Sequence, residues 1–257
     1  MEISKWLTLC GDRRNTRIVM RKLYQREWFG IDFSSFANLD PKNIADGSFY
    51  DKFYDKFYRN FSSYDELPQE WRLSKKQVAD FILSQTNNND RLLSIGCGNG
   101  YIEYLLWREG RNIIAVEPSL KSTRFLEQFS DVKIYHGYFP DCLRRVDEQP
   151  FDWAYMSATE YVFDKRGLVR LLSDMLDFKV RVFLLNSVCI YNKNVLRFMK
   201  HLAKEVLSFL GLYELGQFWG YSRTTDELVQ AFKKAGFKNI ESGFLNINKG
   251  NFWIKGY

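Results

Sequence analysis

An apolar run that ends in closely spaced glycines lies at residues 92–100, which read Leu-Leu-Ser-Ile-Gly-Cys-Gly-Asn-Gly. The run is typical of a buried strand, and it is followed by apolar residues at helical spacing: Ile102, Leu105 and Leu106. Glycine permits a sharp turn and a close approach to a ligand because it has no Cβ. The start of a helix adds N–H groups without partners inside the helix. The stretch therefore predicts a strand, a glycine turn and a helix, the opening unit of an α/β sheet.

A second predicted strand, residues 112–116, ends in Glu117. A carboxylate at the tip of the second strand is where a βαβ nucleotide fold binds ribose hydroxyls. The glycine spacing then separates two classes of ligand. A dinucleotide fingerprint, Gly-x-Gly-x-x-Gly, requires glycine at position 101, where this chain has Tyr101. The third glycine is Gly100 instead, so the pattern does not favour a pyrophosphate.

Gly-x-Gly-x-Gly followed by an acidic residue about twenty positions later resembles motif I of the class I S-adenosylmethionine-dependent methyltransferases. The resemblance implies that S-adenosylmethionine, with S-adenosylhomocysteine as its product, is the cofactor, and that the turn holds its methionine end. One position departs from the family pattern. The family usually has Asp or Glu two residues before the first glycine, where this chain has Ser94. The carboxylate contact to the ammonium of the cofactor is therefore expected to be weaker, or to come from elsewhere.

The resemblance implies cofactor contacts at the turn, at the tip of the second strand, and after the third and fourth strands. The residues after the third strand are aromatic, which favours stacking on the adenine ring over a carboxylate contact. The expected cofactor contacts are Ser94, Gly96, Cys97, Gly98, Asn99, Gly100, Glu117, Pro118, Tyr138, Phe139 and Ser157.

The rest of the chain continues the alternation of strands and helices. Further strands are predicted at residues 132–136, 151–156 and 180–185, and a closing antiparallel hairpin at 237–245 and 251–257. This order resembles the class I methyltransferase fold over residues 76–257. That fold is an α/β three-layer sandwich around a seven-stranded, mostly parallel sheet with a terminal antiparallel hairpin. Residues 1–75 are expected to form a helical, aromatic-rich N-terminal extension.

The aromatic residues of this extension recur with a period of four. Residues 49–58 repeat Phe-Tyr-Asp-Lys and place one stripe of phenylalanines along a helix: Phe49, Phe53, Phe57 and Phe61. Tyr54 and Tyr58 lie on the neighbouring stripe. The helix either packs as ordinary structure, with the tyrosines at its boundary, or covers the site as a lid, with these tyrosines touching the acceptor. Aromatic faces would exclude water and favour a sulfonium cation.

A second segment outside the common core, residues 187–222, is expected to be a helical insert. Residues 195–210 place apolar side chains at helical spacing, with basic side chains mostly elsewhere. A basic amphipathic helix of this kind either packs over a substrate pocket or lies on a membrane surface. Trp219 and Arg223 then belong to an aromatic cluster with one cation. This cluster suits a ring-shaped or anionic acceptor, and equally the packing of a loop.

The loop after the fourth strand carries the candidate catalytic groups, because ligands of open α/β sheets lie beyond the carboxyl ends of the strands. Glu160 and Asp164 resemble the Glu-x-x-x-His stretch of the family, with Asp in the His position, and Tyr161 is an expected acceptor contact. Methyl transfer to an oxygen usually needs a base for the proton. The Asn/Asp-Pro-Pro-aromatic signature of methylation on adenine or glutamine amino groups is absent. The acceptor is therefore expected to be an oxygen, or an amine that is already basic.

Cysteine spacing and charge limit the metal sites, the cellular location and the binding partners that this chain is expected to have. The four cysteines lie far apart without a Cys-x-x-Cys pair, so neither a metal site nor a disulfide framework is predicted. The charged N-terminus does not resemble a secretory signal, and no apolar run reaches the roughly 18 residues of a membrane span, so a cytoplasmic location is expected. The net charge is +6, and the 37 basic residues are interspersed with 31 acidic residues along the chain. It allows a nucleic-acid partner, although no RNA-binding module is visible.

These patterns predict a methyltransferase that acts on an oxygen, or an amine, of a small molecule or glycan. An RNA methyltransferase is the first alternative. A cofactor-binding scaffold or regulator without catalysis is the second. Nucleic acid and a peripheral membrane surface are the less favoured partners, and the sequence predicts no oligomeric state.

Overall fold

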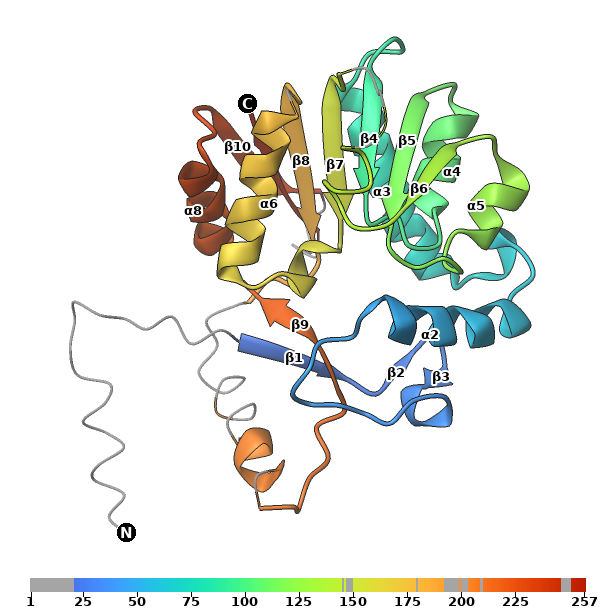
Figure 1. Cartoon of the computed structure of the whole chain (residues 1–257), viewed down its shortest axis with the longest axis vertical. Coiled ribbons are helices and arrows are strands. Elements are labelled where there is room, and N and C mark those ends of the chain that lie inside the picture. The colour runs from blue at the N-terminus through green and yellow to red at the C-terminus, as the bar shows by residue number, and fades with distance from the viewer. Residues whose placement is uncertain are drawn as a thin grey trace, which may run out of the picture.

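The computed structural model describes residues 21–144, 146, 150–178, 180–191, 199, 203–208, 210–245 and 251–257. Within this part of the chain, a seven-stranded sheet has the order β10-β11-β8-β7-β4-β5-β6 (Figure 1). Its strands are β4 (Arg91–Ile95), β5 (Asn112–Glu117), β6 (Lys133–His136), β7 (Trp153–Ser157), β8 (Val182–Ser187), β10 (Ile240–Phe244) and β11 (Phe252–Gly256). The strands from β6 to β8 are parallel, and β11 and β10 close the sheet as an antiparallel hairpin. The predicted sheet is confirmed.

Helices cover both faces of this sheet and make three layers (Figure 1). The helices of the core are α3 (Gln69–Gln85), α4 (Tyr101–Arg108), α5 (Arg124–Phe129), α6 (Lys165–Asp177) and α8 (Thr225–Ala235). Side chains alternate along a strand, so Leu93 and Ile95 of β4 pack with α6 and α8 on one face. Leu92 packs with α3 and α4 on the opposite face. The side chain of Ser94, which belongs to that same face, therefore meets α4.

Local signals position these elements as the sequence suggests. Helix α8 begins with a capping box, in which the Thr224 side chain accepts from the Glu227 N–H and the Glu227 carboxylate accepts from the Thr224 N–H. Between β4 and α4, Gly96, Gly98 and Gly100 all have positive φ, at 71°, 59° and 75°. Glycine adopts this left-handed region without steric penalty. The turn therefore folds back on itself directly above the end of β4.

The N-terminal region contains strands as well as helices. It comprises β1 (Arg21–Gln25), β2 (Glu27–Trp28), β3 (Ile31–Asp32), the 3₁₀ helices η2 (Phe33–Ser35) and η3 (Tyr64–Glu66), and the helix α2 (Gly47–Asn60). Helix α3 continues across the boundary expected at residues 75 and 76. Strand β1 pairs antiparallel with β9 (Gln217–Ser222), more than 190 residues later in the chain.

Strand β9 lies in the segment that was expected to be a helical insert. Its residues, Gln-Phe-Trp-Gly-Tyr-Ser, are rich in the aromatic types that pack well on a pleated surface. Residues 203–208 are helical. The rest of the predicted amphipathic helix lies largely outside the described residues, because 192–198, 200–202 and 209 are not described. No helix of the described residues is long and apolar enough to cross a membrane.

Helix α2 forms where the four-residue repeat predicts it. Asp46 caps its N-terminus by accepting from the Phe49 N–H at 2.9 Å. Phe49, Phe53 and Phe57 are buried in an aromatic cluster with Trp219 of β9. In Figure 1, α2 lies across the edge of the sheet where β4, β5 and β6 end. The phenylalanine stripe therefore faces a core of its own, and the neighbouring stripe faces the sheet.

Candidate cofactor and acceptor site

A cavity of about 580 Å³ lies beyond the carboxyl ends of β4, β5 and β7, where Tyr50 and Tyr54 of α2 also line it. Small-molecule and cofactor sites typically occupy roughly 300–1,000 Å³. The glycine turn, the end of β5 and the loop after β7 form its floor, and aromatic side chains of the N-terminal region and β9 form its roof. The expected residues that line it are Ser94, Gly96, Cys97, Gly98, Asn99, Glu117, Pro118, Tyr138, Ser157, Tyr54, Tyr161 and Trp219.

Glu117 is held rigidly at the tip of β5. One carboxylate oxygen accepts from the Gly98 N–H at 2.8 Å, and the other accepts from the Ser119 N–H at 2.9 Å. Burial raises the pKa of Glu117, and the two N–H donors oppose this rise. Each carboxylate oxygen has more than one acceptor position. The carboxylate is therefore oriented by the chain and still has capacity to accept hydrogen bonds from a ligand in the cavity.

Helix α2 is fastened to this floor by polar contacts. The Ser119 hydroxyl donates to Asp51 at 2.7 Å, and Lys121 forms an ion pair with Asp55 at 2.5 Å. The Tyr54 hydroxyl points to the glycine turn, because a Cβ at Gly98 would lie 3.2 Å from it. A side chain at position 98 would therefore occupy the space between the turn and α2.

The other end of the cavity is polar. Glu103, in the first turn of α4, accepts from the Ser94 hydroxyl at 2.6 Å and from the Tyr155 hydroxyl at 2.9 Å. Lys75 of α3 donates to the Ser157 hydroxyl at 3.5 Å. Burial raises the pKa of Glu103 and lowers the pKa of Lys75, while the attraction between the two opposes both shifts. An acidic and a basic side chain thus line this end of the cavity.

Aromatic rings form the remaining wall. Tyr161 and Trp219 stack with ring planes 17° apart, and Tyr50 contacts Trp219 with ring centroids 5.4 Å apart. Trp28 and Trp71 also line the cavity. Burial raises the pKa of the Tyr50 and Tyr161 hydroxyls, so both remain neutral donors and acceptors. This wall suits a flat or apolar molecule that presents a hydroxyl or amine.

The structure does not bring the two predicted catalytic carboxylates into the cavity. Glu160 is 1% exposed, and its Oε1 accepts from the Ser187 hydroxyl at the end of β8. Its main-chain carbonyl accepts from Arg223. Asp164 caps α6 instead, where it accepts from the Gly167 N–H at 2.6 Å. The 3₁₀ helix η4 (Glu160–Val162) turns Tyr161 toward the cavity and Glu160 away from it.

Four further predicted contacts also lie outside the cavity lining. Tyr58 donates to the carbonyl of Ser122 and fastens α2. Gly100 packs against α5, since a Cβ there would lie 2.6 Å from Leu126. Phe139 packs against Phe178, with ring centroids 5.1 Å apart. The fourth of these contacts is Arg223.

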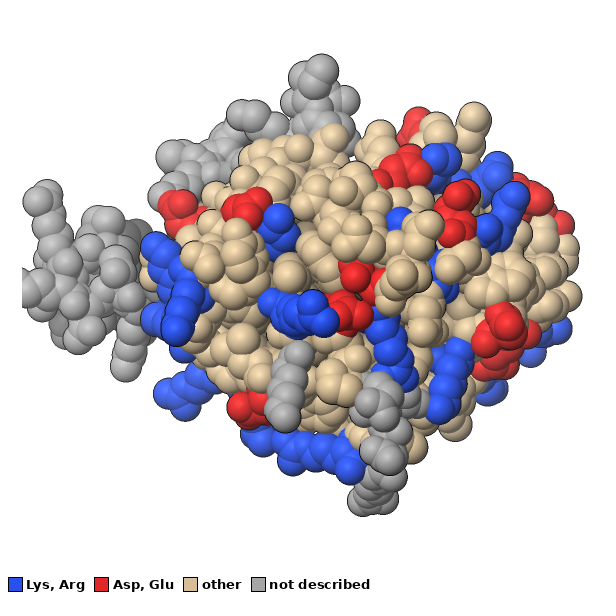
Figure 2. Space-filling view, turned by 90° about the horizontal axis from the view of Figure 1, so that it is seen from above, with Lys and Arg blue, Asp and Glu red and all other residues tan. Residues whose placement is uncertain are grey.

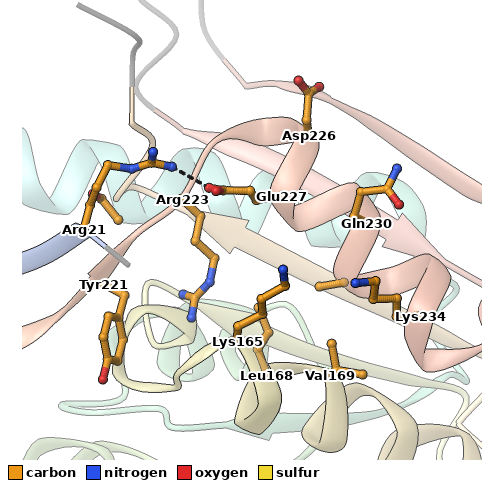
Figure 3. A pocket seen from close by; sticks show the side chains of 12 residues that line it. Arg21, Lys165, Leu168, Val169, Tyr221, Arg223, Asp226, Glu227, Gln230 and Lys234 are labelled. Atoms are coloured by element: carbon orange, nitrogen blue, oxygen red, sulfur yellow. Dashed lines mark hydrogen bonds and ion pairs between the residues drawn. The ribbon is translucent and has the colours of Figure 1, made fainter. Parts of the chain in front are cut away.

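Arg223 lines a second, smaller cavity of about 220 Å³ between α6 and α8. Figure 3 shows its guanidinium among Lys165, Tyr221 and Leu168, near the ion pair that Arg21 forms with Glu227 at 2.7 Å. Its guanidinium donates to the carbonyls of Glu160 and Phe163. Arg223 therefore holds η4 and the residue after it through main-chain carbonyls, and it does not line the larger cavity.

The sequence analysis did not identify three charged residues that line the cavity: Asp46, Lys75 and Glu103. Glu103 carried a usable signal, because it is an acidic residue in the first turn of the helix that follows the glycines. Lys75 carried none, since it is one of two adjacent lysines on α3 and only the packing of α3 brings it to Ser157 at the end of β7. No group of three or more metal-ligating side chains is found among the described residues.

Charges are mixed on the face seen in Figure 2, where Lys and Arg side chains are interspersed with Asp and Glu. The visible part of that face carries no continuous basic track of the kind that follows a nucleic-acid backbone.

Comparison with solved structures identifies similar folds. A candidate O-methyltransferase from Nostoc punctiforme aligns over 88% of this chain and 66% of its own, with 12% identity and a TM-score of 0.58. Human N-acetylserotonin methyltransferase in complex with S-adenosylmethionine aligns over 82% of this chain and 56% of its own, with 13% identity and a TM-score of 0.53. Magnesium protoporphyrin IX methyltransferase from Synechocystis with bound S-adenosylmethionine aligns over 84% and 98%, with 10% identity and a TM-score of 0.56.

No protein-family model matches the sequence, and no curated protein matches it either. The chain spans about two thirds of the Nostoc protein and little more than half of the human enzyme, but nearly all of the Synechocystis enzyme. At these identities the similarity concerns the fold alone. The sheet order, the glycine turn and the terminal hairpin of this chain are consistent with that fold. The chain therefore has the fold of the class I S-adenosylmethionine-dependent methyltransferases.

Proposed function

We propose that this protein is an S-adenosylmethionine-dependent methyltransferase that methylates an oxygen, or a basic amine, of a small molecule or glycan. The observation that carries the proposal is Glu117, oriented by two main-chain N–H groups beside the glycine turn, in a cavity that also has an aromatic wall. Structural neighbours with bound S-adenosylmethionine or S-adenosylhomocysteine support the choice of cofactor.

The residues of the cavity fit this cofactor from end to end. Glu117 has free acceptor positions for the ribose hydroxyls, and Pro118 and Tyr138 border the space beside it for the adenine. The three glycines keep the turn free of side chains, and the Tyr54 hydroxyl reaches toward Gly98. When bound, the cofactor would supply an electrophilic methyl group on a sulfonium, whose positive charge aromatic faces favour.

The contribution of the chain to catalysis is to hold the acceptor in line and to exclude water. Trp219 and Tyr161 offer a flat surface for an acceptor ring, and the Tyr50 and Tyr161 hydroxyls offer hydrogen bonds to its reacting oxygen or nitrogen. Glu160 is too enclosed to accept a proton from the acceptor. Orientation by the aromatic wall therefore replaces the carboxylate base in this proposal.

Calorimetry tests the cofactor assignment. S-adenosylhomocysteine should bind with micromolar affinity, while NAD should not bind. Glu117→Ala should weaken S-adenosylhomocysteine binding about 10- to 100-fold, because charge-assisted hydrogen bonds contribute roughly 1.5–3 kcal/mol. Glu109→Ala, on the exposed end of α4, is the matched control and should bind like the wild type.

Transfer of radiolabelled methyl groups tests the activity. Phenols, catechols, amines, oligosaccharides and total RNA serve as separate acceptor pools. Labelling of a phenol, amine or oligosaccharide pool supports the proposal, and labelling of RNA alone would replace the small-molecule acceptor with RNA. Tight cofactor binding without labelling of any pool would favour a non-catalytic scaffold. Tight NAD binding without S-adenosylhomocysteine binding would overturn the proposal altogether.

A further inference from the structure

Glu103 places a partly satisfied carboxylate at the polar end of the cavity. Its side chain is 2% exposed, and the Ser94 and Tyr155 hydroxyls both donate to Oε1. No hydrogen bond from a described residue reaches Oε2. Removing a carboxylate from water is costly unless donors or a cation compensate for it. The open oxygen is therefore placed to receive a donor from a ligand.

Lys75 places a partly satisfied ammonium at the same end. Its Nζ makes one long hydrogen bond, 3.5 Å to the Ser157 hydroxyl, and lies 5.8 Å from the centroid of the Trp71 ring. An ammonium has three N–H donors. Donor capacity therefore remains for an anionic group inside the cavity, which Lys75 lines.

The sheet register spaces the residues that bond the Glu103 carboxylate and the Lys75 ammonium. Ser94 and Tyr155, which hold Glu103, are direct neighbours on β4 and β7. Ser157, which holds Lys75, follows Tyr155 by two residues on the same face, a step of about 7 Å along a strand. A group that carries both charges on one carbon fits between them, since each charge-assisted hydrogen bond spans about 2.8 Å.

We propose that Glu103 and Lys75 form a zwitterion subsite for the amino-acid end of the cofactor. Glu103 binds the α-ammonium, and Lys75 binds the α-carboxylate. Ser94, which has no carboxylate of its own, orients the one that α4 supplies. This inference rests on the proposed function, because it concerns the same cavity and the same cofactor. Together with Glu117 at the opposite end, it gives the cavity one fixed direction for the bound molecule.

The subsite makes binding depend on two separate charges of the ligand. Four probes differ only in that end of the molecule. They are S-adenosylhomocysteine, its decarboxylated analogue, its deaminated analogue and 5′-methylthioadenosine, which lacks the amino-acid group altogether. Calorimetry of each probe with the wild type, Glu103→Gln and Lys75→Met measures which charge each residue binds, without any turnover.

Each variant should lose affinity only for the probes that carry the group bound by the replaced residue, which is the ammonium for Glu103 and the carboxylate for Lys75. Glu103→Gln should weaken S-adenosylhomocysteine and the decarboxylated analogue about 10- to 100-fold, and Lys75→Met should do the same to S-adenosylhomocysteine and the deaminated analogue. Methylthioadenosine should bind all three proteins equally. Its binding also shows that each variant has kept a folded adenosine site.

Matched controls remove a charge nearby without entering the cavity. Lys76 is the next residue after Lys75 on α3, is exposed, and forms an ion pair with Asp80 at 2.7 Å. Lys76→Met therefore removes a neighbouring positive charge that lies outside the cavity. Glu109→Gln removes an exposed carboxylate from the end of α4. Both controls should bind every probe like the wild type.

Two results would overturn the subsite while leaving the proposed function intact. One is wild-type affinity for S-adenosylhomocysteine in Glu103→Gln or Lys75→Met. The other is a wild type that binds methylthioadenosine as tightly as S-adenosylhomocysteine. If the wild type binds none of the four probes, the proposed function fails together with the subsite.

Discussion

At the scale of single residues, the glycine turn contributes both to the lining of the cavity and to the packing of the core. Gly96 and Gly98 line the cavity, whereas Gly100 packs against α5. All three have positive φ, so none is readily replaced by a residue with a Cβ. The motif thus lines the cavity at two positions and contacts a helix at the third.

Gly100→Ala should destabilise the protein more than Gly110→Ala does. Both glycines have a φ of 75°, which costs a residue with a Cβ about 1–2 kcal/mol. Only at Gly100 would the new Cβ also meet Leu126 at 2.6 Å, and overpacking adds about 1–3 kcal/mol. Urea denaturation measures both changes. Equal losses for the two variants would show that the contact with α5 relaxes freely.

Glu160 is placed to affect stability rather than the transfer of a proton. Burial raises its pKa in the folded protein, so the folded state binds its proton more tightly than the unfolded state does. The contribution of Glu160 is therefore most favourable below its unfolded pKa and is lost as pH rises through its folded pKa. Glu160→Gln should match the wild type near pH 4 and become relatively more stable toward pH 8. Urea denaturation across this range measures the difference.

Measurement of cofactor binding helps to distinguish a role of Glu160 in stability from a role at the cofactor site. Glu160→Gln should bind S-adenosylhomocysteine like the wild type, because Glu160 does not line the cavity. A stability difference that stays constant across pH would mean that Glu160 titrates normally and is not desolvated in the folded protein.

At the scale of elements, α2 divides its aromatic residues between two tasks. The phenylalanine stripe is buried against Trp219, while Tyr54 lines the cavity and Tyr58 fastens the helix to the carbonyl of Ser122. The helix is held to the floor at several points along its length. The helix therefore covers one side of the cavity, with Tyr54 in the cavity lining and Tyr58 hydrogen-bonded to the main chain.

Tyr54→Phe and Tyr58→Phe should separate these tasks. Loss of the Tyr54 hydroxyl should weaken S-adenosylhomocysteine binding about 2- to 12-fold, the equivalent of roughly 0.5–1.5 kcal/mol, and change stability little. Loss of the Tyr58 hydroxyl should lower the unfolding free energy by a similar amount and leave affinity unchanged. Calorimetry and urea denaturation of both variants measure this. Identical behaviour of the two would contradict the division.

At the scale of the whole molecule, segments distant in sequence enclose one cavity. Strand β1 from the N-terminal region pairs with β9 from beyond β8, and the aromatic cluster joins both to α2. Trp219 belongs both to this aromatic cluster and to the wall of the cavity. Its ring stacks on Phe33, with centroids 5.2 Å apart, and also on Tyr161 at the cavity wall. The stability of the roof and the shape of the cavity therefore depend on the same side chain.

Trp219→Ala should cost about 3–5 kcal/mol of unfolding free energy, the usual loss for a large buried ring, and should also weaken S-adenosylhomocysteine binding. Trp253→Ala is the control, since Trp253 of β11 packs against Phe81 of α3 and does not line the cavity. It should lower stability without changing affinity. Loss of affinity in both variants would mean that the cavity responds to stability in general.

Local backbone requirements made much of this structure predictable. The alternation of strands and helices, the glycine turn and the carboxylate at the tip of β5 are confirmed, because each depends on neighbours within a few residues. The four-residue repeat likewise predicted α2 and the burial of its phenylalanines. Pairing of β1 with β9 was not predictable, since it joins residues far apart in the chain.

The direction of side chains in irregular segments also escaped prediction. Glu160 and Tyr161 are adjacent, yet η4 buries the carboxylate against Ser187 and turns only the ring to the cavity. Periodicity assigns a face to a residue in a helix or strand, but not to a residue in a loop. The choice between the two residues came from the packing of η4 against β8 and Arg223.

The sequence by itself determined the sheet, the glycine turn that lines the cavity and the position of Glu117, because short-range geometry dictates all three. Only the tertiary structure decided which charges meet in the cavity. Position 94 is a serine, and α4 brings the Glu103 carboxylate within 2.6 Å of its hydroxyl. Lys75 reaches the same place from α3. Packing of helices on the sheet sets such encounters, and no local pattern in the chain records them.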